Sequence, residues 1–157
     1  MTRGLFACLF LAACGPPQQV DAIVPTTQTC TDAPDVPTHG LALLVGAGSS
    51  GAFVPLTPGT VLALQHGPQG GTHVYLDVLF HADAKGPWKI TSHLARPSGS
   101  QEADTTVVDA CVGWNRVNDV RFVLYAGGGD GDLDVRAAPT DGSSAELKTA
   151  PIAVSIR

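Results

Sequence analysis

Two histidines that flank a glycine-rich segment are the side chains best placed to do chemistry in this 157-residue chain. His66 and His73 lie on either side of Gly-Pro-Gln-Gly-Gly, and opposed residues of a β-hairpin have Cβ atoms about 5 Å apart. Such a pair would suit copper or zinc. The register that buries the apolar residues instead pairs Leu64 with Leu76, which turns His66 inward and His73 outward. We therefore predict no metal site here and keep a two-histidine site as the alternative.

Three aspartates, Asp130, Asp132 and Asp134, alternate along the chain as they do at the start of a calcium-binding loop. An EF-hand loop would require glycine where Val135 stands and glutamate where Asp141 stands. Alternation of charged and apolar residues is typical of a strand, and charges at a sheet edge discourage pairing with another chain. We predict a charged hairpin at an edge. Metal binding by these aspartates, alone or with the two histidines, is the alternative.

Signatures of catalysis do not accompany these residues. No serine lies in a G-x-S-x-G motif, and the other histidines lie in separate segments without an acidic residue at a telling spacing. Gly46, Gly48 and Gly51 match G-x-G-x-x-G. Pro55 and Pro58 follow, however, and prevent the helix that a dinucleotide site requires. We predict a protein that is not an enzyme and has no cofactor.

The N-terminus has the features of an export signal. Arg3 precedes a short apolar run, Leu5 to Ala13, which is far below the roughly 20 residues needed to span a bilayer. The run ends in Leu-Ala-Ala-Cys, which resembles the lipobox of bacterial lipoproteins. The resemblance implies cleavage after residue 13 and fatty acylation of Cys14. Gly15 is not the acidic residue that signals inner-membrane retention in that family, which favours the outer membrane in a cell with two membranes.

The charge of the mature chain limits its partners. Loss of Arg3 reduces Lys plus Arg from nine to eight, while Asp plus Glu stays at fourteen, so the net charge becomes −6. This charge repels phosphate backbones and anionic headgroups, so we expect no nucleic-acid binding. Membrane attachment is then expected through the N-terminal lipid alone.

Two cysteines remain once Cys8 leaves with the signal and Cys14 is acylated. Export would place Cys30 and Cys111 in an oxidising compartment, and an even remainder predicts one disulfide. It would close a loop of about eighty residues, worth about 4 kcal/mol in the chain-entropy model. Two free thiols that hold a metal are the alternative.

The rest of the chain divides into a tether and one domain. Residues 14–39 contain five prolines and no periodic apolar pattern, which predicts a disordered tether. From residue 40 to 157, short β-branched runs alternate with Gly and Pro, and none has helical periodicity. We predict an all-β, antiparallel β-sandwich. Its expected strands are 41–45, 60–66, 72–82, 88–94, 106–113, 119–126, 133–138 and 151–156.

Alternation within these runs assigns their faces. The apolar residues of the 72–82 run are predicted to face the core: Val74, Leu76, Val78 and Phe80. His73 and Tyr75 share the outer face, so we take them as the candidate binding surface for a protein or glycan partner. Val112 is predicted to face inward and Cys111 outward, where the tether could reach it.

A second resemblance covers about 35 residues, from Leu43 to Val78. This segment resembles a recurring pattern of uncharacterised secreted and lipid-anchored bacterial proteins. In that pattern a G-x-G…F-x-P-L segment and a strand precede a Gly-Pro-Gln-Gly-Gly-x-His loop. The matching positions are Gly46, Gly48, Phe53, Pro55, Leu56, Gly67, Pro68, Gln69, Gly70, Gly71 and His73. The resemblance implies an immunoglobulin-like sandwich and no particular activity.

The predicted function combines these features. We expect a lipid-anchored protein of the bacterial cell envelope with a non-enzymatic binding or structural role. A metal-binding envelope lipoprotein is the alternative.

Overall fold

The computed structural model describes residues 26–48, 51–67 and 70–157. The predicted signal peptide (1–13), the acylation site at Cys14 and the tether up to residue 25 lie outside these residues, as do Pro68 and Gln69 of the loop motif. Within the described part of the chain, no helix is long and apolar enough to cross a membrane.

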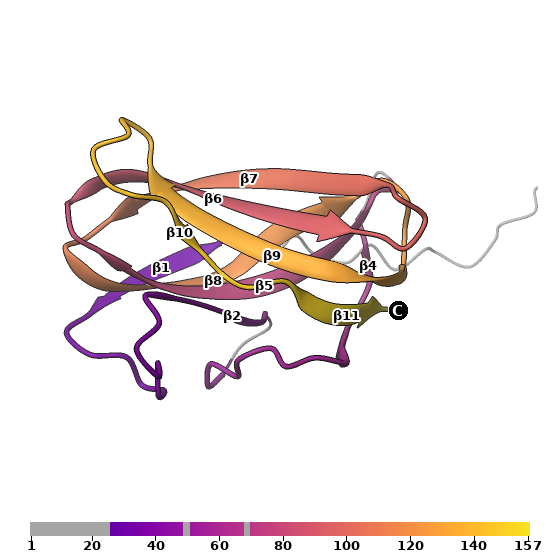
Figure 1. Ribbon diagram of the computed structural model, residues 1–157, viewed down its shortest axis with the longest axis horizontal. Helices are drawn as coiled ribbons and strands as arrows, with labels where there is room; N and C mark the ends of the chain where they lie inside the picture. The colour runs from indigo at the N-terminus through magenta and orange to yellow at the C-terminus, as the bar shows by residue number, and fades with distance from the viewer. Residues whose placement is uncertain (1–25, 49–50, 68–69) are drawn as a thin grey trace, which may run out of the picture.

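The described residues form a β-sandwich of two packed sheets (Figure 1), as predicted. The first sheet has the order β1-β8-β5-β2, with β4 also paired to β5, and the second has the order β3-β11-β9-β6-β7, with β10 also paired to β9. Neighbouring strands are antiparallel except β11 and β3, which run parallel. The strands are β1 (Thr27–Thr31), β2 (Leu43–Ala47), β3 (Thr60–Leu62), β4 (Gln65–His66), β5 (Thr72–Ala82), β6 (Gly86–Ala95), β7 (Gln101–Ala110), β8 (Gly113–Leu124), β9 (Gly129–Pro139), β10 (Leu147–Lys148) and β11 (Ile152–Ile156).

Alternate apolar side chains from both sheets fill the space between them. The predicted inward set of β5, from Val74 to Phe80, is at most 1% exposed. The ring of Phe80 lies 5.2 Å from that of Trp88 on β6, so these two side chains join the sheets. Burial on this scale, at about 25 cal/mol per Å² of apolar surface, is the main term that stabilises the fold.

The expected strand 60–66 is in fact two strands in different sheets. β3 pairs with β11 in the second sheet, and β4 pairs with β5 in the first, with Gln65 opposite His73. Leu62 is buried beside β11, and the chain crosses between the layers before Gln65. The predicted hairpin register, with Leu64 opposite Leu76, is therefore wrong.

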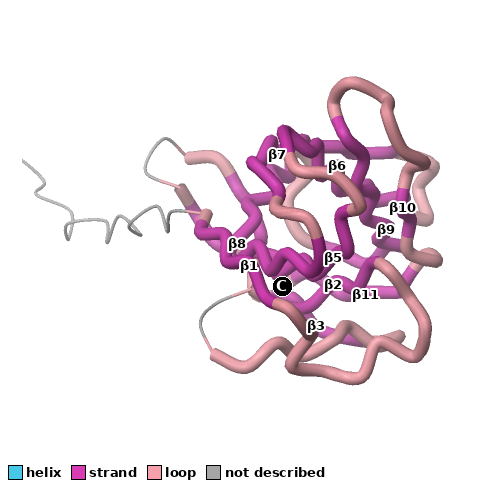
Figure 2. The backbone as a smooth tube through the Cα atoms, turned by 90° about the vertical axis from the view of Figure 1, so that its left-hand side faces the viewer, coloured by secondary structure: helices cyan, strands magenta, loops and turns pink. Residues whose placement is uncertain are grey.

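The folded unit begins earlier than residue 40. β1 lies within the expected tether and beside β8 (Figure 2). The two strands pair with Cys30 opposite Asn115. Its sequence, Thr-Gln-Thr-Cys-Thr, is rich in β-branched residues that favour strands, although it has no apolar alternation to reveal it. Of the expected tether, residues 27–31 are therefore part of a sheet.

The chain after β2 folds back over the outer face of the first sheet. Gly46 forms a bridge with Pro55, and the Gly48 N–H donates to the Tyr75 carbonyl at 2.9 Å. A Cβ on Gly48 would lie 2.8 Å from the carbonyl carbon of Tyr75, closer than real side chains come. The G-x-G pattern thus permits close backbone approach, and it lets Phe53 become buried over the sheet.

Candidate functional site

The predicted disulfide between Cys30 and Cys111 is present, with Cα atoms 6.1 Å apart. β7 ends before Cys111 and β8 begins after Val112, so these two residues form the connection between the sheets. The prediction that Val112 faces inward is wrong, because a side chain in this connection has no sheet to face, and Val112 is 66% exposed.

Asn115 holds this connection in place and is fully buried. Its side-chain oxygen accepts the Cys111 N–H at 2.8 Å and a Gln28 amide N–H at 3.0 Å. Its side-chain nitrogen donates to the carbonyls of Cys111 and Gly113 at 2.8 and 2.9 Å. The start of the domain is therefore fixed by a covalent link and by one fully satisfied amide.

The two histidines of the candidate metal site are placed differently from the prediction. His66 is exposed, whereas the register predicted it to face inward. The reason is the crossing before Gln65, which makes His66 pair with Thr72 at the end of the sheet. His73 lies on the outer side of β5 as expected, but it is covered and only 7% exposed.

His73 and Tyr75, the candidate binding surface, are engaged within the fold. Their rings meet edge to face with centroids 4.9 Å apart, and both residues have further interactions. A Cβ on Gly67 would lie 3.7 Å from the His73 ring, so the turn between β4 and β5 packs on this histidine. This surface is a packed cluster rather than an open platform.

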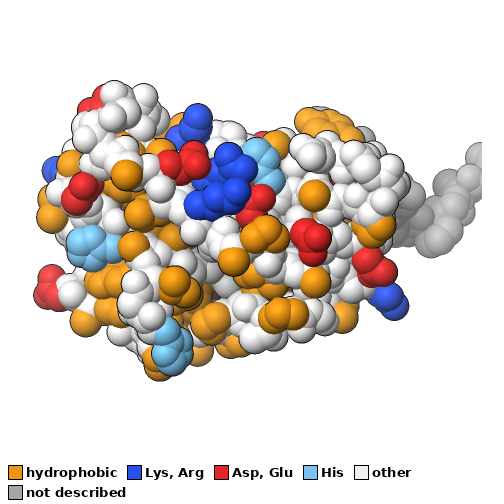
Figure 3. Space-filling view, in the orientation of Figure 1, with side chains coloured by type: hydrophobic (Ala, Val, Ile, Leu, Met, Phe, Trp, Pro, Cys, Tyr) orange, Lys and Arg blue, Asp and Glu red, His pale blue; other side chains and the backbone are white. Residues whose placement is uncertain are grey.

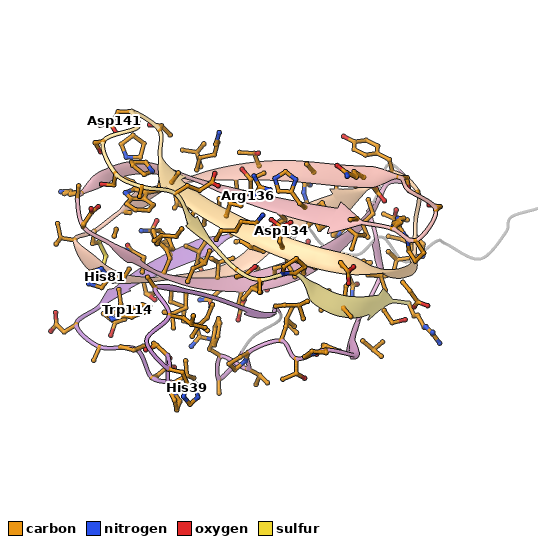
Figure 4. All side chains as sticks on the ribbon, viewed as in Figure 1. His39, His81, Trp114, Asp134, Arg136 and Asp141 are labelled. Atoms are coloured by element: carbon orange, nitrogen blue, oxygen red, sulfur yellow. A yellow bond between two sulfur atoms is a disulfide. The ribbon has the colours of Figure 1, made fainter. Side chains whose placement is uncertain are left out.

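The three aspartates follow one face of β9. β9 lies between β11 and β6, so the prediction of a charged edge is wrong, although the predicted alternation is confirmed. Alternate residues of a strand are about 6.7 Å apart, so these carboxylates do not converge on one ion. Asp134 instead contacts Arg136 at 3.1 Å (Figure 4), and Asp130 accepts the Ser155 hydroxyl at 2.6 Å.

The structure does not bring the histidines and the aspartates together. His66 and His73 belong to the first sheet and the aspartates to the outer face of the second. In the described parts of the chain, no group of three or more His, Cys, Asp or Glu side chains could hold a metal.

The best-connected polar cluster is one that the sequence did not indicate. Arg116 of β8 lies on the outer face of the first sheet, where it joins the sheet to the segments that cross it. Its partners are the carboxylates of Asp35 (3.2 Å) and Asp77 (3.5 Å), the Asn118 side chain (2.8 Å), the Gly51 carbonyl (2.6 Å) and the Phe53 ring (5.8 Å to its centroid). One cation therefore clamps two covering segments onto β5 and β8.

Asp77 lies where the register between β5 and β8 shifts. It faces Asn118 and Asp119, and Asp119 has a positive φ of 55°. Asp77 accepts the Asp119 N–H at 3.0 Å and is 3% exposed. Burial raises the pKa of Asp77, and the Asp119 carboxylate adds to the rise against the opposing effects of that hydrogen bond and of Arg116. The Oδ1 atom of Asp119 is itself buried without a hydrogen-bond partner.

A second buried ion pair closes one end of the sandwich. Arg96 donates to Glu102 at 2.7 Å across the turn between β6 and β7, and both side chains are less than one-tenth exposed. Arg96 also donates to the carbonyls of Gly127 and Gly128. Burial tends to raise the pKa of Glu102, but hydrogen bonds from Arg96 and from the N–H groups of Tyr125 and Ala126 outweigh it and lower the pKa.

The opposite end of the first sheet carries an aromatic pair. His81 and Trp114 are cross-strand neighbours whose rings meet edge to face at 5.4 Å (Figure 4). His81 is exposed and Trp114 half-buried.

An apolar groove lies at the open side of the sandwich, between the edge strand β2 and the segment that joins β10 to β11. Its volume is about 250 Å³. Leu41, Leu43, Leu56, Lys148 and Ile152 are among the residues that line it. Hydrophobic side chains gather on this face below the charged residues of β9 (Figure 3).

Comparison with known proteins assigns no family. No family model and no curated protein matches the chain. A solved structure described as the N-terminal domain of PorA aligns with 73% of this chain and 95% of its own chain, at 11% identity and a TM-score of 0.30. A superposition of that quality indicates neither a shared family nor a shared function.

Proposed function

We propose that this chain is a lipid-anchored protein of the bacterial cell envelope, whose β-sandwich has a non-enzymatic binding or structural role. The observation that carries the proposal is the pairing of Cys30 with Cys111. Disulfides persist outside the reducing cytosol, so this pairing agrees with an exported chain. It also leaves Cys14, the cysteine of the lipobox-like sequence, available for acylation.

The position of β1 defines how the domain would be held. Residues 15–26 separate Cys14 from β1, and an extended chain of that length spans at most about 40 Å. Tension from the anchor would act on β1, where the disulfide and the pairing with β8 resist it. The domain would therefore stay close to the membrane surface. The glycine at position 15 favours the outer membrane in a cell with two membranes.

The buried charges support a non-enzymatic role. Asp77 and Arg116 hold covering segments on the first sheet, while Glu102 and Arg96 hold the turns at one end. Both carboxylates are less than one-tenth exposed, and their contacts are structural.

The anchoring is tested with Cys14→Ser and a fatty-acid analogue that labels acylated proteins. We expect the variant to lose labelling and to move from the membrane fraction to the soluble fraction of the envelope, whereas Cys8→Ser keeps both. Persistent labelling of Cys14→Ser would contradict the proposal.

Metal analysis tests the alternative. We expect the purified mature chain to hold less than about 0.1 equivalent of copper, zinc or calcium, and to melt at the same temperature with and without chelator. One equivalent of bound metal, with a chelator-dependent melting temperature, would favour a metal-binding lipoprotein instead.

A further inference from the structure

We infer that one end of the sandwich, the end that carries Tyr125, rests on the membrane surface with the Tyr125 ring among the lipid headgroups. This inference rests on the proposed lipid anchor and adds which part of the domain faces the bilayer. The lipid remains the attachment, and the contact sets only the orientation of the domain.

The two ends of the sandwich differ in charge. The connections β4–β5, β6–β7 and β8–β9 lie at the Tyr125 end, and Figure 1 shows β4 and the end of β11 on that side of the molecule. The connections β5–β6, β7–β8 and β9–β10 and the segment after β1 lie at the opposite end, which we call the acidic end. The described residues of the three connections at the Tyr125 end include no Asp or Glu. Five exposed carboxylates lie in the connections of the acidic end: Asp32, Asp35, Asp83, Asp141 and Glu146.

This difference favours the Tyr125 end as the side that faces a bilayer. β8 has 12 residues, so the two ends are about 40 Å apart. Charges in physiological salt are screened over about 8 Å. With the Tyr125 end on the bilayer, the five carboxylates lie several screening lengths from anionic headgroups, whereas the reverse orientation would bring them close.

The acidic residues at the start of β9 do not oppose this orientation. Asp130 and Asp132 are exposed, but they lie on the outer face of the second sheet and not in a connection at its end. Asp130 is also paired with Arg157 at 3.7 Å. The surface that would meet the headgroups is therefore free of unpaired acidic side chains in the described part of the chain.

The structure presents Tyr125 on a main chain that is held in place. Tyr125 is the most exposed of the large hydrophobic residues in the described chain, at 85%. Glu102 accepts its N–H and that of the next residue, and Arg96 donates to both carbonyls of the glycine pair that follows. The buried ion pair thus fixes the whole turn while the ring stays in solvent. Tyrosine is enriched at bilayer interfaces because its ring is apolar and its hydroxyl polar.

The turn between β6 and β7 can also approach the headgroups closely. Its residues 97–100, Pro-Ser-Gly-Ser, are all exposed and have small side chains. The Ser98 and Ser100 hydroxyls lie 3.0 Å apart, and hydroxyls can donate to phosphate oxygens. This turn therefore adds polar contacts beside the Tyr125 ring.

The predicted tether is long enough for this contact. β1 begins at Thr27 opposite Asn118, so Tyr125 lies about 23 Å farther along the direction of β8. Residues 15–26 span at most about 40 Å, which covers that distance. Anchoring also raises the concentration of the domain at the surface to the order of millimolar, so a weak contact is enough to orient it.

The test uses the acylated mature chain in vesicles of equal parts phosphatidylethanolamine and phosphatidylglycerol, with a tracer lipid that carries a nitroxide on its headgroup. A fluorophore is attached to Ala126→Cys or, as the matched control, to Ala145→Cys, an exposed alanine at the acidic end. With Cys14 acylated and Cys30 bonded to Cys111, the introduced thiol is the only free one in the mature chain. We expect the nitroxide to quench the fluorophore at position 126 at least about fivefold more than at position 145, because the two ends are about 40 Å apart.

An added charge tests the part played by Tyr125. In the Ala126→Cys chain, Tyr125→Glu places a carboxylate where the ring would meet the headgroups, and we expect quenching to fall at least about threefold. Val112→Glu adds the same charge at the acidic end, where Val112 is 66% exposed, and should change quenching by less than about 1.5-fold. Both side chains are exposed, so both variants should melt at the wild-type temperature.

Three results would overturn the inference: equal quenching at the two positions, stronger quenching at position 145, or quenching at position 126 that Tyr125→Glu leaves unchanged. Flotation of the chain with the vesicles reports the anchor separately, because it requires acylation whatever the orientation. A chain that floats but is quenched equally at both positions would refute the orientation alone. A chain that does not float would refute the proposed anchor and, with it, the orientation.

Discussion

Asp77 and Glu102 are both carboxylates buried against an arginine, yet their pKa values shift in opposite directions. Asp77 is 3% exposed and Glu102 8% exposed, so burial acts on both. The pKa of Asp77 rises, because burial outweighs its favourable contacts, and that of Glu102 falls. The presence of an arginine therefore does not decide which way a buried carboxylate shifts.

The number and geometry of hydrogen bonds decide the direction of the pKa shift. Glu102 accepts from Arg96 at 2.7 Å and from the N–H groups of Tyr125 and Ala126. Asp77 accepts one N–H, from Asp119. Arg116 is 3.5 Å away and is shared with other acceptors, while the Asp119 carboxylate repels the charge. Hydrogen bonds to the ionised form lower a pKa, whereas burial and a like charge raise it.

Removal of the disulfide should have the largest effect, and it should affect the region around Asp77 but not the region around Glu102. We expect Cys30→Ala with Cys111→Ala to lower the free energy of unfolding by about 4 kcal/mol, because the bond closes a loop with a sequence separation of 81. β1 would loosen, and with it the Thr26 hydroxyl that donates to the Asp119 carbonyl at 3.0 Å. Urea unfolding measures the loss. NMR titration should show the pKa of Asp77 returning toward its ordinary value while that of Glu102 stays low. A loss below about 1 kcal/mol would contradict the assigned role of the bond.

Removal of Arg96 should lower the stability of the domain more than removal of Arg116. Arg96→Met leaves the ionised Glu102 buried without its cation, and we expect a loss of about 3 kcal/mol. Arg116→Met should cost only about 1 to 2 kcal/mol, because Asp77 takes up a proton more readily. Thermal and urea unfolding at pH 7 measure both. Equal losses would show that the two pairs do not differ in the way their hydrogen bonds indicate.

The sequence predicted the layers of this fold better than it predicted the polar clusters. Alternation identified the buried side of β5 correctly, from Val74 to Phe80, because a period of two directly reports which residues face the core. It could not divide residues 60–66 between two sheets, since a strand pattern does not indicate its partner. β1 was missed because its threonines carry no apolar alternation.

The Asp77 cluster was beyond sequence reasoning for a similar reason. Arg116, which contacts Asp77, also binds Asp35 and Gly51, and these two residues come from segments whose path over the sheet is set by long-range packing. The Arg96–Glu102 pair, in contrast, is indicated by the sequence. Arg96 and Glu102 carry opposite charges on either side of Pro-Ser-Gly-Ser, a turn that brings its flanks together. The disulfide was predictable because the number of cysteines left in the mature chain can be counted without knowledge of the fold.

Neutralisation of Glu102 should remove a pH-dependent contribution to stability. We expect Glu102→Gln to lose about 2 kcal/mol at pH 7, because one carboxylate oxygen accepts two backbone N–H groups and the other accepts from Arg96. The pKa of Glu102 is lowered in the folded state, so its contribution is present above the unfolded pKa and disappears as pH falls through the folded pKa. The difference between wild type and variant should therefore shrink below about pH 5. Glu146→Gln, in an exposed pair at 3.9 Å, serves as the control and should change stability by less than about 0.5 kcal/mol.

Neutralisation of Asp77 should have the smallest effect and the opposite sign. The pKa of Asp77 is raised in the folded state, so the folded chain holds this proton where the unfolded chain has released it, and wild-type stability falls as pH rises between the two pKa values. Asn at this position can still accept the Asp119 N–H, and it no longer repels the Asp119 carboxylate. We expect Asp77→Asn to match the wild type near pH 3 and to be more stable at pH 7, by less than about 1 kcal/mol. Asp35→Asn removes a carboxylate from the same Arg116, but its side chain is 57% exposed, so it should give a small loss at pH 7. A loss of stability in Asp77→Asn that grows from pH 3 to pH 7 would show that Arg116 stabilises the ionised Asp77. Asp77 and Glu102 would then shift in the same direction, which would contradict the comparison.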